Sequence, residues 1–272
     1  MPSLLEKLKQ GQAFASIPTM LNEERRRAIQ EIISNEGRGL VKDLAERFHT
    51  SQVTIRKDLE TLHDQGLAQR THGGALPVQA GALLDPSLRE KEKQHRKEKQ
   101  RIGKAAADLV KEGESVLLDS GTTTMAVARA LRDRGRLTVI TNAVNISAEL
   151  SGTHIEVILT GGTLRENSFS LVGPLAEGTL RRLSADVLFL GVDGLDVHFG
   201  VTTPNLLEAS VNRVMVEIAR RTVLVCDSSK FGRRSLSLIT PVSGIHEVIT
   251  DNKIPKADLR ALTEAGIKVT IV

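Results

Sequence analysis

VKDLAERFHTSQVTIRKDLETLHDQGLAQRTHGGA, residues 41 to 75, is the stretch that decides the fold of the N-terminal part of this chain. Apolar residues recur in it at helical spacing in two successive runs, Val41, Leu44, Ala45 and Phe48, then Ile55, Leu59 and Leu62. Thr50 and Ser51 lie between the runs and can cap the second helix. The glycine-ended segment after the second run predicts a small hairpin. Two short helices, a turn and a hairpin are the layout of a winged helix-turn-helix.

The second of these helices carries a polar and partly basic face. In a helix-turn-helix, the first turns of the recognition helix bring side chains to base edges and phosphates in the major groove of DNA. The alternative is a helical hairpin with a solvated charged face, which would account for each of these features taken alone. The prediction of a DNA-binding domain therefore depends on the order of the features: a buried first helix, a cap, TIRKDL, and then G-x-x-x-R-x-H-G-G. The predicted DNA contacts are Ser51, Gln52, Thr54, Arg56 and Lys57 on the helix, with Arg70 and His72 on the hairpin.

This order of features resembles the DNA-binding domain of the DeoR family of bacterial repressors, whose pattern is close to VS-x-x-TIRRDL-x-x-L-x-x-x-G-x-x-x-R-x-HGGA. The family usually has Gly and Val before the serine, whereas this chain has His49 and Thr50. We therefore expect a slightly strained turn there, with His49 in place of a glycine at positive φ. Lys57 replaces the second arginine, which keeps the charge but loses the bidentate fork and suits a phosphate better than a guanine.

Length and composition indicate a two-domain protein, because 272 residues exceed one typical domain and the hydrophobic fraction of 40% is ordinary. No apolar run approaches the roughly 20 residues that span a bilayer, and the N-terminus lacks the features of a signal peptide. We expect a cytoplasmic protein without membrane contact. The single cysteine, Cys226, excludes an internal disulfide, and the seven scattered histidines show no metal-site spacing, so we predict no metal and no cofactor. The formal net charge of +4 agrees with nucleic-acid binding without establishing it.

Changes of pattern divide the chain into four parts. Residues 1–19 are expected to be a flexible N-terminal tail, and Met20 is a candidate for the true initiator. Residues 20–75 form the predicted DNA-binding domain, in which Asn22 can cap the first helix. Residues 76–96 are the expected linker, because residues 76–90 hold two prolines and a glycine without clear periodicity. Residues 97–272 form the second domain.

The densest basic run, REKEKQHRKEKQRIGK, spans residues 89–104. Its glutamates, Glu90, Glu92 and Glu98, compensate part of the positive charge. The run is interpreted as a solvated helix, with contacts to the DNA backbone as the alternative.

Apolar runs of strand length alternate with helical segments from about residue 97 onward. The runs are VLLD, TVIT, IEVILT, DVLFLG, TVLVC, EVIT and KVTIV. This alternation predicts an α/β fold, with a parallel sheet covered by helices on both faces. Ligands of such sheets bind at the carboxyl ends of the strands. Residues 119–124, DSGTTT, follow one strand and open a helix, so their hydroxyls, backbone N–H groups and helix dipole predict a site for an anion, most simply a phosphate.

Small, hydroxyl-bearing or charged residues follow five of the predicted strands. Taken singly, each has a plain alternative as a turn glycine or a helix cap, but five such ends favour a shared pocket. Neither a Walker loop nor G-x-G-x-x-G after a strand is present, which disfavours nucleoside triphosphates and dinucleotides. The pocket suits a small phosphorylated polyol or sugar. The candidate ligand-binding residues are Asp119, Ser120, Gly121, Thr122, Thr123, Thr124, Thr141, Asn142, Gly161, Gly162, Arg165, Asp193 and Lys230.

The second domain also resembles the effector domain of the DeoR family, so the likeness covers about residues 22 to 272. The matching strings are LLDSGTTT, ILTGGTLRENSFSLVGPLAEGTL, FLGVDGLDVHFGVTTPNLLEASVNRVM and VCDSSKFGRRSL. Such domains are related to ribose-5-phosphate isomerase and glucosamine-6-phosphate deaminase and bind sugar phosphates as inducers. The resemblance implies that residues 120–124 hold the phosphate, and that Asp193, Glu208 and Lys230 face the sugar. TGG-x-LR-x-x-S-x-S and GVDG-x-D are especially close to repressors of N-acetylgalactosamine, other amino-sugar or galactitol pathways.

These observations predict a repressor of a sugar or amino-sugar operon. It would bind double-stranded operator DNA as a homo-oligomer, a dimer or tetramer, and a phosphorylated sugar would release it, with residues 76–104 transmitting the change. The alternative is a sugar-phosphate isomerase or deaminase-like enzyme. Asp193 and Asp196 form a D-G-x-D, and Glu208 and Lys230 could act as base and electrostatic stabiliser in proton transfer next to a carbonyl. The attached DNA-binding domain argues against catalysis, because a pocket inherited from an enzyme ancestor would look the same in sequence.

Overall fold

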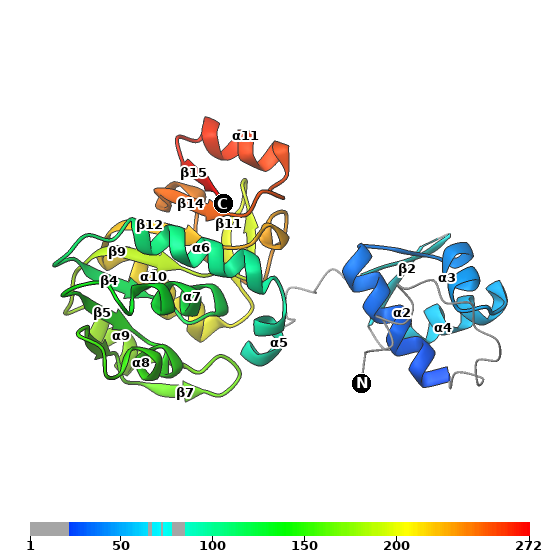
Figure 1. Cartoon of the computed structure of the whole chain (residues 1–272), viewed down its shortest axis with the longest axis horizontal. Helices are drawn as coiled ribbons and strands as arrows, with labels where there is room; N and C mark the ends of the chain where they lie inside the picture. The colour runs from blue at the N-terminus through cyan, green and yellow to red at the C-terminus, as the bar shows by residue number, and fades with distance from the viewer. Residues whose placement is uncertain (1–21, 65–66, 72, 78–84) are drawn as a thin grey trace. The chain divides into compact units, whose positions relative to one another are not determined.

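The computed structural model describes residues 22–64, 67–71, 73–77 and 85–272. The chain divides into two compact units, Met1–Gly81 and Ala82–Val272 (Figure 1). The expected N-terminal tail, residues 1–19, and the candidate initiator Met20 lie outside the described residues, as do His72 and residues 78–84 of the expected linker. None of the helices in the described ranges is long and apolar enough to cross a membrane.

The N-terminal unit is a winged helix-turn-helix, as the sequence predicted. Its helices are α2 (Asn22–Glu36), α3 (Val41–Arg47) and α4 (Gln52–Asp64), and its strands β1 (Gly39–Leu40), β2 (Ala68–Thr71) and β3 (Gly74–Pro77) form an antiparallel sheet in the order β1-β3-β2. The predicted apolar runs meet in one core, which includes Ile29, Ile33, Leu44, Ile55 and Leu59. A glycine is required in the wing, because a Cβ on Gly74 would lie 2.1 Å from the carbonyl oxygen of Gly39.

The turn between α3 and α4 confirms two expectations. His49 has φ 47°, so a histidine holds the left-handed conformation in which the family pattern has glycine. Ser51 precedes α4, and its Oγ accepts a hydrogen bond from the backbone N–H of Thr54 at 3.1 Å, so it caps the helix. Asn22 does not cap α2 as expected. It is the first residue of the helix, and its Oδ1 accepts a hydrogen bond from the Arg25 side chain instead.

The second unit is built on a seven-stranded sheet in the order β15-β14-β12-β9-β4-β5-β6, in which every neighbouring pair is parallel. Each strand falls on one of the seven predicted apolar runs. The strands are β4 (Ser115–Leu118), β5 (Thr138–Thr141), β6 (Glu156–Leu159), β9 (Ala185–Leu190), β12 (Ala219–Val225), β14 (Glu247–Thr250) and β15 (Lys268–Ile271). The predicted α/β fold class with a parallel sheet is therefore confirmed.

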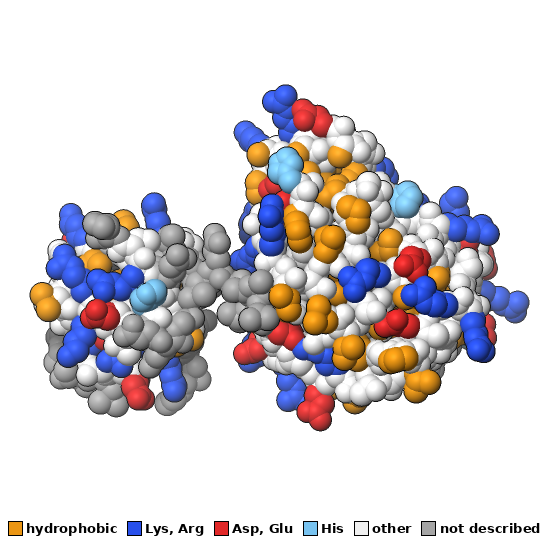
Figure 2. Space-filling model, turned by 180° about the vertical axis from the view of Figure 1, so that it is seen from behind, with side chains coloured by type: hydrophobic (Ala, Val, Ile, Leu, Met, Phe, Trp, Pro, Cys, Tyr) orange, Lys and Arg blue, Asp and Glu red, His pale blue; other side chains and the backbone are white. Residues whose placement is uncertain are grey.

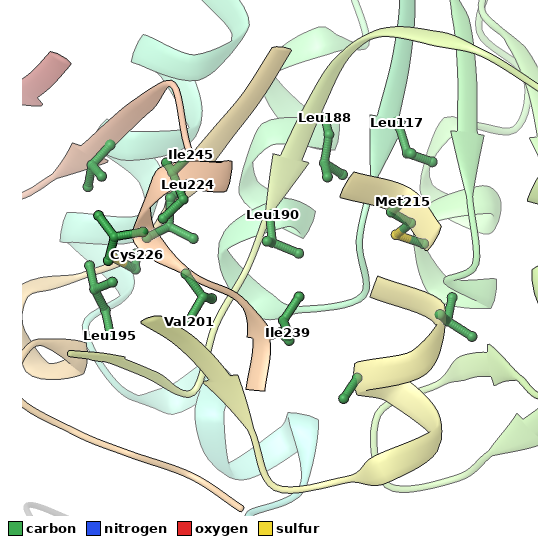
Figure 3. Close-up of a cluster of buried hydrophobic side chains, with 14 of the residues drawn as sticks. Leu117, Leu188, Leu190, Leu195, Val201, Met215, Leu224, Cys226, Ile239 and Ile245 are labelled. Carbon is green, nitrogen blue, oxygen red and sulfur yellow. The ribbon is translucent and has the colours of Figure 1, made fainter. Parts of the chain in front are cut away.

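Alternation along the strands builds two hydrophobic cores, one on each face of the sheet. Val187 and Phe189 of β9 contribute to one core, and Leu188 and Leu190 to the other (Figure 3). Helices α6 (Arg96–Asp108), α7 (Thr122–Leu131) and α8 (Val144–Leu150) cover the first core, and α9 (Pro174–Leu180), α10 (Leu206–Ile218) and α11 (Lys256–Glu264) cover the second.

Smaller elements complete the second unit beside the main sheet. They are the hairpin β7 (Thr163–Arg165) and β8 (Ser170–Val172), the sheet of β10 (Gly194–Asp196), β11 (Gly200–Thr203) and β13 (Ser237–Thr240), the short helix α5 (Leu88–Lys93), and the 3₁₀ turns η1 (Ser228–Lys230) and η2 (Val242–Gly244). Of these elements, α5, the loop between β7 and β8, β11 and η1 contribute residues to the site described below.

The segment between the two units differs from its prediction in two ways. Residues 85–96 belong to the second unit rather than to a linker, because α5 is a capped helix whose side chains contact that unit. The basic run 89–104 is not one solvated helix. It breaks between α5 and α6 at His95, which has φ 52°, and its Lys99 is buried.

Candidate functional site

A polar pocket lies at the carboxyl ends of strands β4, β9 and β12, where the sequence predicted one. The open space inside it is about 50 Å³. It brings together eight of the candidate residues, Asp119, Ser120, Gly121, Thr122, Thr123, Asp193, Glu208 and Lys230. Other residues that line it are Leu88, Lys91, Lys99, Asn167, Ser168, Gly191, Val192, Thr203 and Asn212.

The N-terminus of α7 opens into this pocket. Gly121 precedes the helix, and among the described residues no side chain caps it, so the first backbone N–H groups have no intrahelical or capping acceptor. The helix dipole adds partial positive charge at the same place. Thr124 does not line the pocket, because its hydroxyl is buried and donates to the carbonyl of Gly121 at 3.1 Å, which closes the turn. The arrangement can bind an anion through backbone donors and the Thr122 and Thr123 hydroxyls.

Three carboxylates face the pocket in different environments. Asp119 accepts from the backbone N–H groups of Ser120 at 2.6 Å and Gly191 at 3.2 Å, yet burial, together with Glu208 and Asp193 nearby, raises the pKa of Asp119 well above its ordinary value. Burial opposes ionisation of Asp193 too, but Lys91 and then Lys230 outweigh it and hold the pKa of Asp193 below its ordinary value. The pocket therefore offers both carboxylate acceptors and a carboxyl group that tends to keep its proton.

Three lysines balance these acids. Lys91 pairs with Asp193, with 2.6 Å between Nζ and Oδ1. Lys99 donates from Nζ to the backbone carbonyls of Lys91 at 2.7 Å and Gln94 at 2.9 Å, and burial lowers the pKa of Lys99 to about 8. Lys230 lines the pocket without an ion-pair partner within 4.0 Å among the described residues. A cation without a close partner is available to an anionic ligand.

Glu208 lines the pocket, whereas the candidate residue Arg165 of β7 does not line it but pairs with Glu208. Arg165 donates from Nη1 to Glu208 Oε1 at 3.1 Å, and from Nη2 to Asp85. Ser170 also donates to Glu208 Oε1, at 2.8 Å. Asn212 of α10 lines the same pocket, and its Oδ1 is buried without a hydrogen-bond partner among the described residues. A buried acceptor without a partner is costly, so a ligand hydroxyl or amine is a suitable donor for it.

Four other candidates shape the loops instead of lining the pocket. Thr141 donates to the carbonyl of Leu118 at 2.8 Å and is fully buried. Asn142 is also fully buried and donates from Nδ2 to the carbonyl of Leu171 at 3.2 Å. Gly161 and Gly162 make the turn into β7 with φ 72° and 121°. These residues hold adjacent strand ends in register.

Lys91, Lys99, Thr203, Ser168 and Asn212 line the pocket but are absent from the candidate set. Lys99 had a signal in the sequence, because it stands three and four residues before Ile102 and Gly103 and therefore falls on the buried face of its helix. A lysine on an apolar helix face needs polar partners, which the backbone carbonyls of Lys91 and Gln94 supply. Asp196, the second acid of D-G-x-D, points elsewhere and pairs with Arg234 at 2.7 Å.

The candidate DNA-reading surface is the exposed face of α4. Gln52, Arg56 and Lys57 are exposed there, and the Thr54 hydroxyl lies 2.8 Å from Ser51 Oγ. Arg70 on β2 is exposed and pairs with Glu60 at 3.2 Å, while His72 lies outside the described residues. Figure 2 shows basic side chains on the face of the N-terminal unit that it presents.

Two basic residues of α2 have a structural role in the N-terminal unit. Arg25 and Arg26 of α2 both pair with Asp58 of α4, at 2.6 and 3.1 Å, and the Asp58 side chain is 2% exposed. This ion-paired cluster joins α2 to α4.

Comparison with known proteins gives matches over both units. The model of the DeoR-like helix-turn-helix domain matches residues 25–79, and that of the DeoR C terminal sensor domain matches residues 94–252. The HTH-type transcriptional regulator GlpR of Haloferax volcanii is 41% identical over 92% of this chain and 98% of its own length. A putative aga operon transcriptional repressor of Escherichia coli O157:H7 is 41% identical over 92% of this chain and 93% of its own length. The glycerol-3-phosphate regulon repressor of Escherichia coli K12 is 30% identical over 93% of this chain and 100% of its own length.

Proposed function

This chain belongs to the DeoR family of transcriptional repressors of sugar metabolism, and on that premise we propose that a phosphorylated sugar or amino sugar binds the pocket of its second unit and releases the protein from operator DNA. The observation that carries the proposal is the meeting of the uncapped N-terminus of α7, Lys230 and the carboxylates in one pocket. A ligand with a phosphate at one end and hydroxyl or amino groups at the other complements both halves.

The phosphate is assigned to the α7 end of the pocket. Backbone N–H groups at a helix N-terminus and a lysine ammonium are the donors that phosphate uses in proteins. The sugar is assigned to the side with Asp193 and Asn212, where carboxylate and amide oxygens accept hydrogen bonds from hydroxyl or amino groups. The name of one relative, a glycerol-3-phosphate regulon repressor, supports a small phosphorylated metabolite.

The N-terminal unit is proposed to read its operator with α4 in the major groove. Gln52, Thr54 and Arg56 would face base edges and Lys57 a phosphate, with Arg70 on the wing. We further propose that the protein acts in the cytoplasm as a dimer or tetramer, so that two such helices meet successive half-sites.

The protein is a regulator and not an enzyme, and the arrangement of Glu208 agrees with this. An isomerase-type mechanism would need Glu208 as a free base. Its Oε1 instead accepts from both Arg165 and Ser170. The residue serves the pocket as a fixed part of its wall.

The proposal is tested by selecting duplexes from a random DNA pool with the full-length protein, and titrating the enriched duplex with a panel of sugar and amino-sugar phosphates at near-physiological salt. We expect a repeated half-site whose affinity falls when one sugar phosphate is added. Enrichment without any response to the panel would contradict the ligand assignment. No enrichment would contradict the assignment of α4 as the reader.

A further inference from the structure

The segment Asp85–Lys93, which carries the chain into the second unit, lines the pocket with Leu88 and Lys91 (α5 in Figure 1). Lys91 pairs with Asp193 at 2.6 Å, and Asp85 pairs with Arg165. Two hydrogen bonds of 2.8 Å join the same segment to the β7–β8 hairpin, one from Asn167 Nδ2 to the carbonyl of Asp85 and one from the N–H of Leu88 to the carbonyl of Asn167. The segment is therefore attached to the site at both ends.

The same contacts occupy groups that the proposed effector needs. Lys91 holds the carboxylate of Asp193, which would accept the hydroxyl or amino groups of a sugar. About 50 Å³ of open space remains beneath the segment, whereas ligand pockets in proteins typically hold roughly 300–1,000 Å³. The effector and the segment thus compete for one place.

The break between α5 and α6 opposes the local sequence. Residues 88–102, LREKEKQHRKEKQRI, contain no glycine or proline and consist mainly of good helix formers. Yet His95 adopts the left-handed conformation, φ 52° and ψ 35°, which is unfavourable for any residue with a Cβ. Lys99 compensates by donating to the carbonyls of Lys91 and Gln94 at the end of α5. Tertiary contacts with the pocket therefore hold a break that the sequence alone would not make.

We propose that the segment Asp85–Lys93 is an internal plug of the effector pocket, and that effector binding displaces it so that α5 continues α6 as one helix. The proposal rests on the proposed function and describes how that site is regulated. Competition for Asp193 gives the effector a higher affinity for the displaced arrangement, which is the condition for a ligand-driven shift. In the chain, the displaced segment follows the N-terminal unit and the connection between the units, so its displacement acts on that connection.

The rest of α6 stays in place during this change. Its Ile102, Ala106 and Ala107 are buried in the core, and a Cβ on Gly103 would lie 2.5 Å from the backbone carbon of Ala126 in α7. Because α6 and α7 pack backbone to backbone there, movement is confined to the residues before His95. The fixed part of α6 is the reference against which the plug moves.

Distance measurement between spin labels tests the proposal in the full-length protein. Arg89→Cys on α5 and Lys104→Cys on α6 place labels on exposed residues. One continuous helix would set their backbones roughly 22 Å apart, at about 1.5 Å per residue, and a break shortens this distance. The native chain without added cysteines is the labelling control, because burial of the Cys226 thiol raises its pKa and hinders its reaction.

The probes are galactosamine 6-phosphate, galactose 6-phosphate, glycerol 3-phosphate and inorganic phosphate, with binding measured by calorimetry in the same samples. A probe that binds should move the label distance toward the continuous-helix value. Binding with an unchanged distance would overturn the plug and leave the proposed function intact. If no probe binds, the proposed ligand class is wrong. The plug is then tested with Lys91→Met, which should lengthen the label distance without ligand. An unchanged distance in Lys91→Met would overturn the plug.

A matched pair at His95 tests the break itself. His95→Gly and His95→Ala both remove the imidazole, whose Nε2 lies 3.9 Å from Asp227, so that loss cancels between them. Glycine tolerates the left-handed conformation and disfavours helix, and alanine does the reverse. The probe concentration needed for half displacement should be higher in the glycine variant by a factor on the order of ten to a hundred. Equal concentrations in two variants that both fold would refute the break as the switch.

Discussion

Replacement of Asp58 should destabilise the N-terminal unit more than the small size of this side chain suggests. The residue lies in TIRKDL, on α4, the helix proposed to read DNA, but it faces the interior with 2% of its side chain exposed. It pairs with Arg25 at 2.6 Å and Arg26 at 3.1 Å. Asp58→Asn keeps the shape and removes the charge, which leaves the Arg25 guanidinium, 9% exposed, without its charged partner.

The magnitude follows from the burial of the pair. Removal of one partner of a buried ion pair costs about 3–5 kcal/mol. Here the lower end applies, because Arg26 is 25% exposed and Arg25 keeps a bond to Asn22. A unit of roughly 60 residues has a stability of about 3–9 kcal/mol. At about 4–8 °C for each kcal/mol in a domain of this size, a loss of about 3 kcal/mol should lower the Tm of the unit by roughly 12–24 °C.

Scanning calorimetry of the full-length protein measures the change in the Tm of the N-terminal unit, because each unit has its own core and should give its own transition. The transition of the second unit serves as an internal reference. Asp43→Asn, an exposed acid in the first turn of α3, is the matched control and should change the Tm little. Arg25→Met combined with Asp58→Leu should recover much of the loss, since an apolar pair can replace a buried ion pair. A Tm for Asp58→Asn within a few degrees of the native value would refute the structural role.

Three further changes separate the reader from the pocket. Arg56→Ala should weaken operator binding tenfold or more without altering effector affinity. Lys57→Ala should weaken binding to all DNA sequences and reduce the slope of log affinity against log salt concentration by about one. DNA titration measures both effects. Thr122→Ala with Thr123→Ala should lower effector affinity in calorimetry by about 1–3 kcal/mol in total and leave operator affinity unchanged; loss of both functions in either case would contradict separate sites. Because burial lowers the pKa of Lys99 from 10.5 to about 8, the unfolded state binds more protons above pH 8, and stability of the second unit should rise between pH 8 and 10.5 relative to Lys99→Met. Equal pH profiles would contradict a buried, charged Lys99.

The sheet was predictable because parallel strands buried on both faces are short continuous apolar runs. All seven runs became strands, and the two cores follow from alternation within them, as Leu117 faces one core while Val116 and Leu118 face the other. The position of the pocket was predictable for a similar reason. Parallel strands end at one edge of a sheet, and the loops after them must meet there.

The direction of each loop side chain was not predictable from its position after a strand. Thr122 is the first residue of α7, after β4, and Thr141 is the last residue of β5, but Thr122 lines the pocket and Thr141 donates to the carbonyl of Leu118. The difference depends on the neighbouring strand, which supplies a carbonyl for one hydroxyl and not for the other. Contacts between residues distant in sequence were also not predictable. Lys91, for example, pairs with Asp193, which is about a hundred residues away in the sequence.

The motif that resembles the family's reading helix encodes folding in half of its residues. In TIRKDL, Ile55 and Leu59 are core residues and Asp58 ties two helices together, so half of the motif faces inward. Only Thr54, Arg56 and Lys57 remain for DNA, and Lys57 is suited to a phosphate. A match to such a motif therefore establishes a reading helix without specifying its operator. Changes at exposed positions of α4 should alter the preferred operator sequence at little cost in stability, whereas changes at Asp58 should alter stability first.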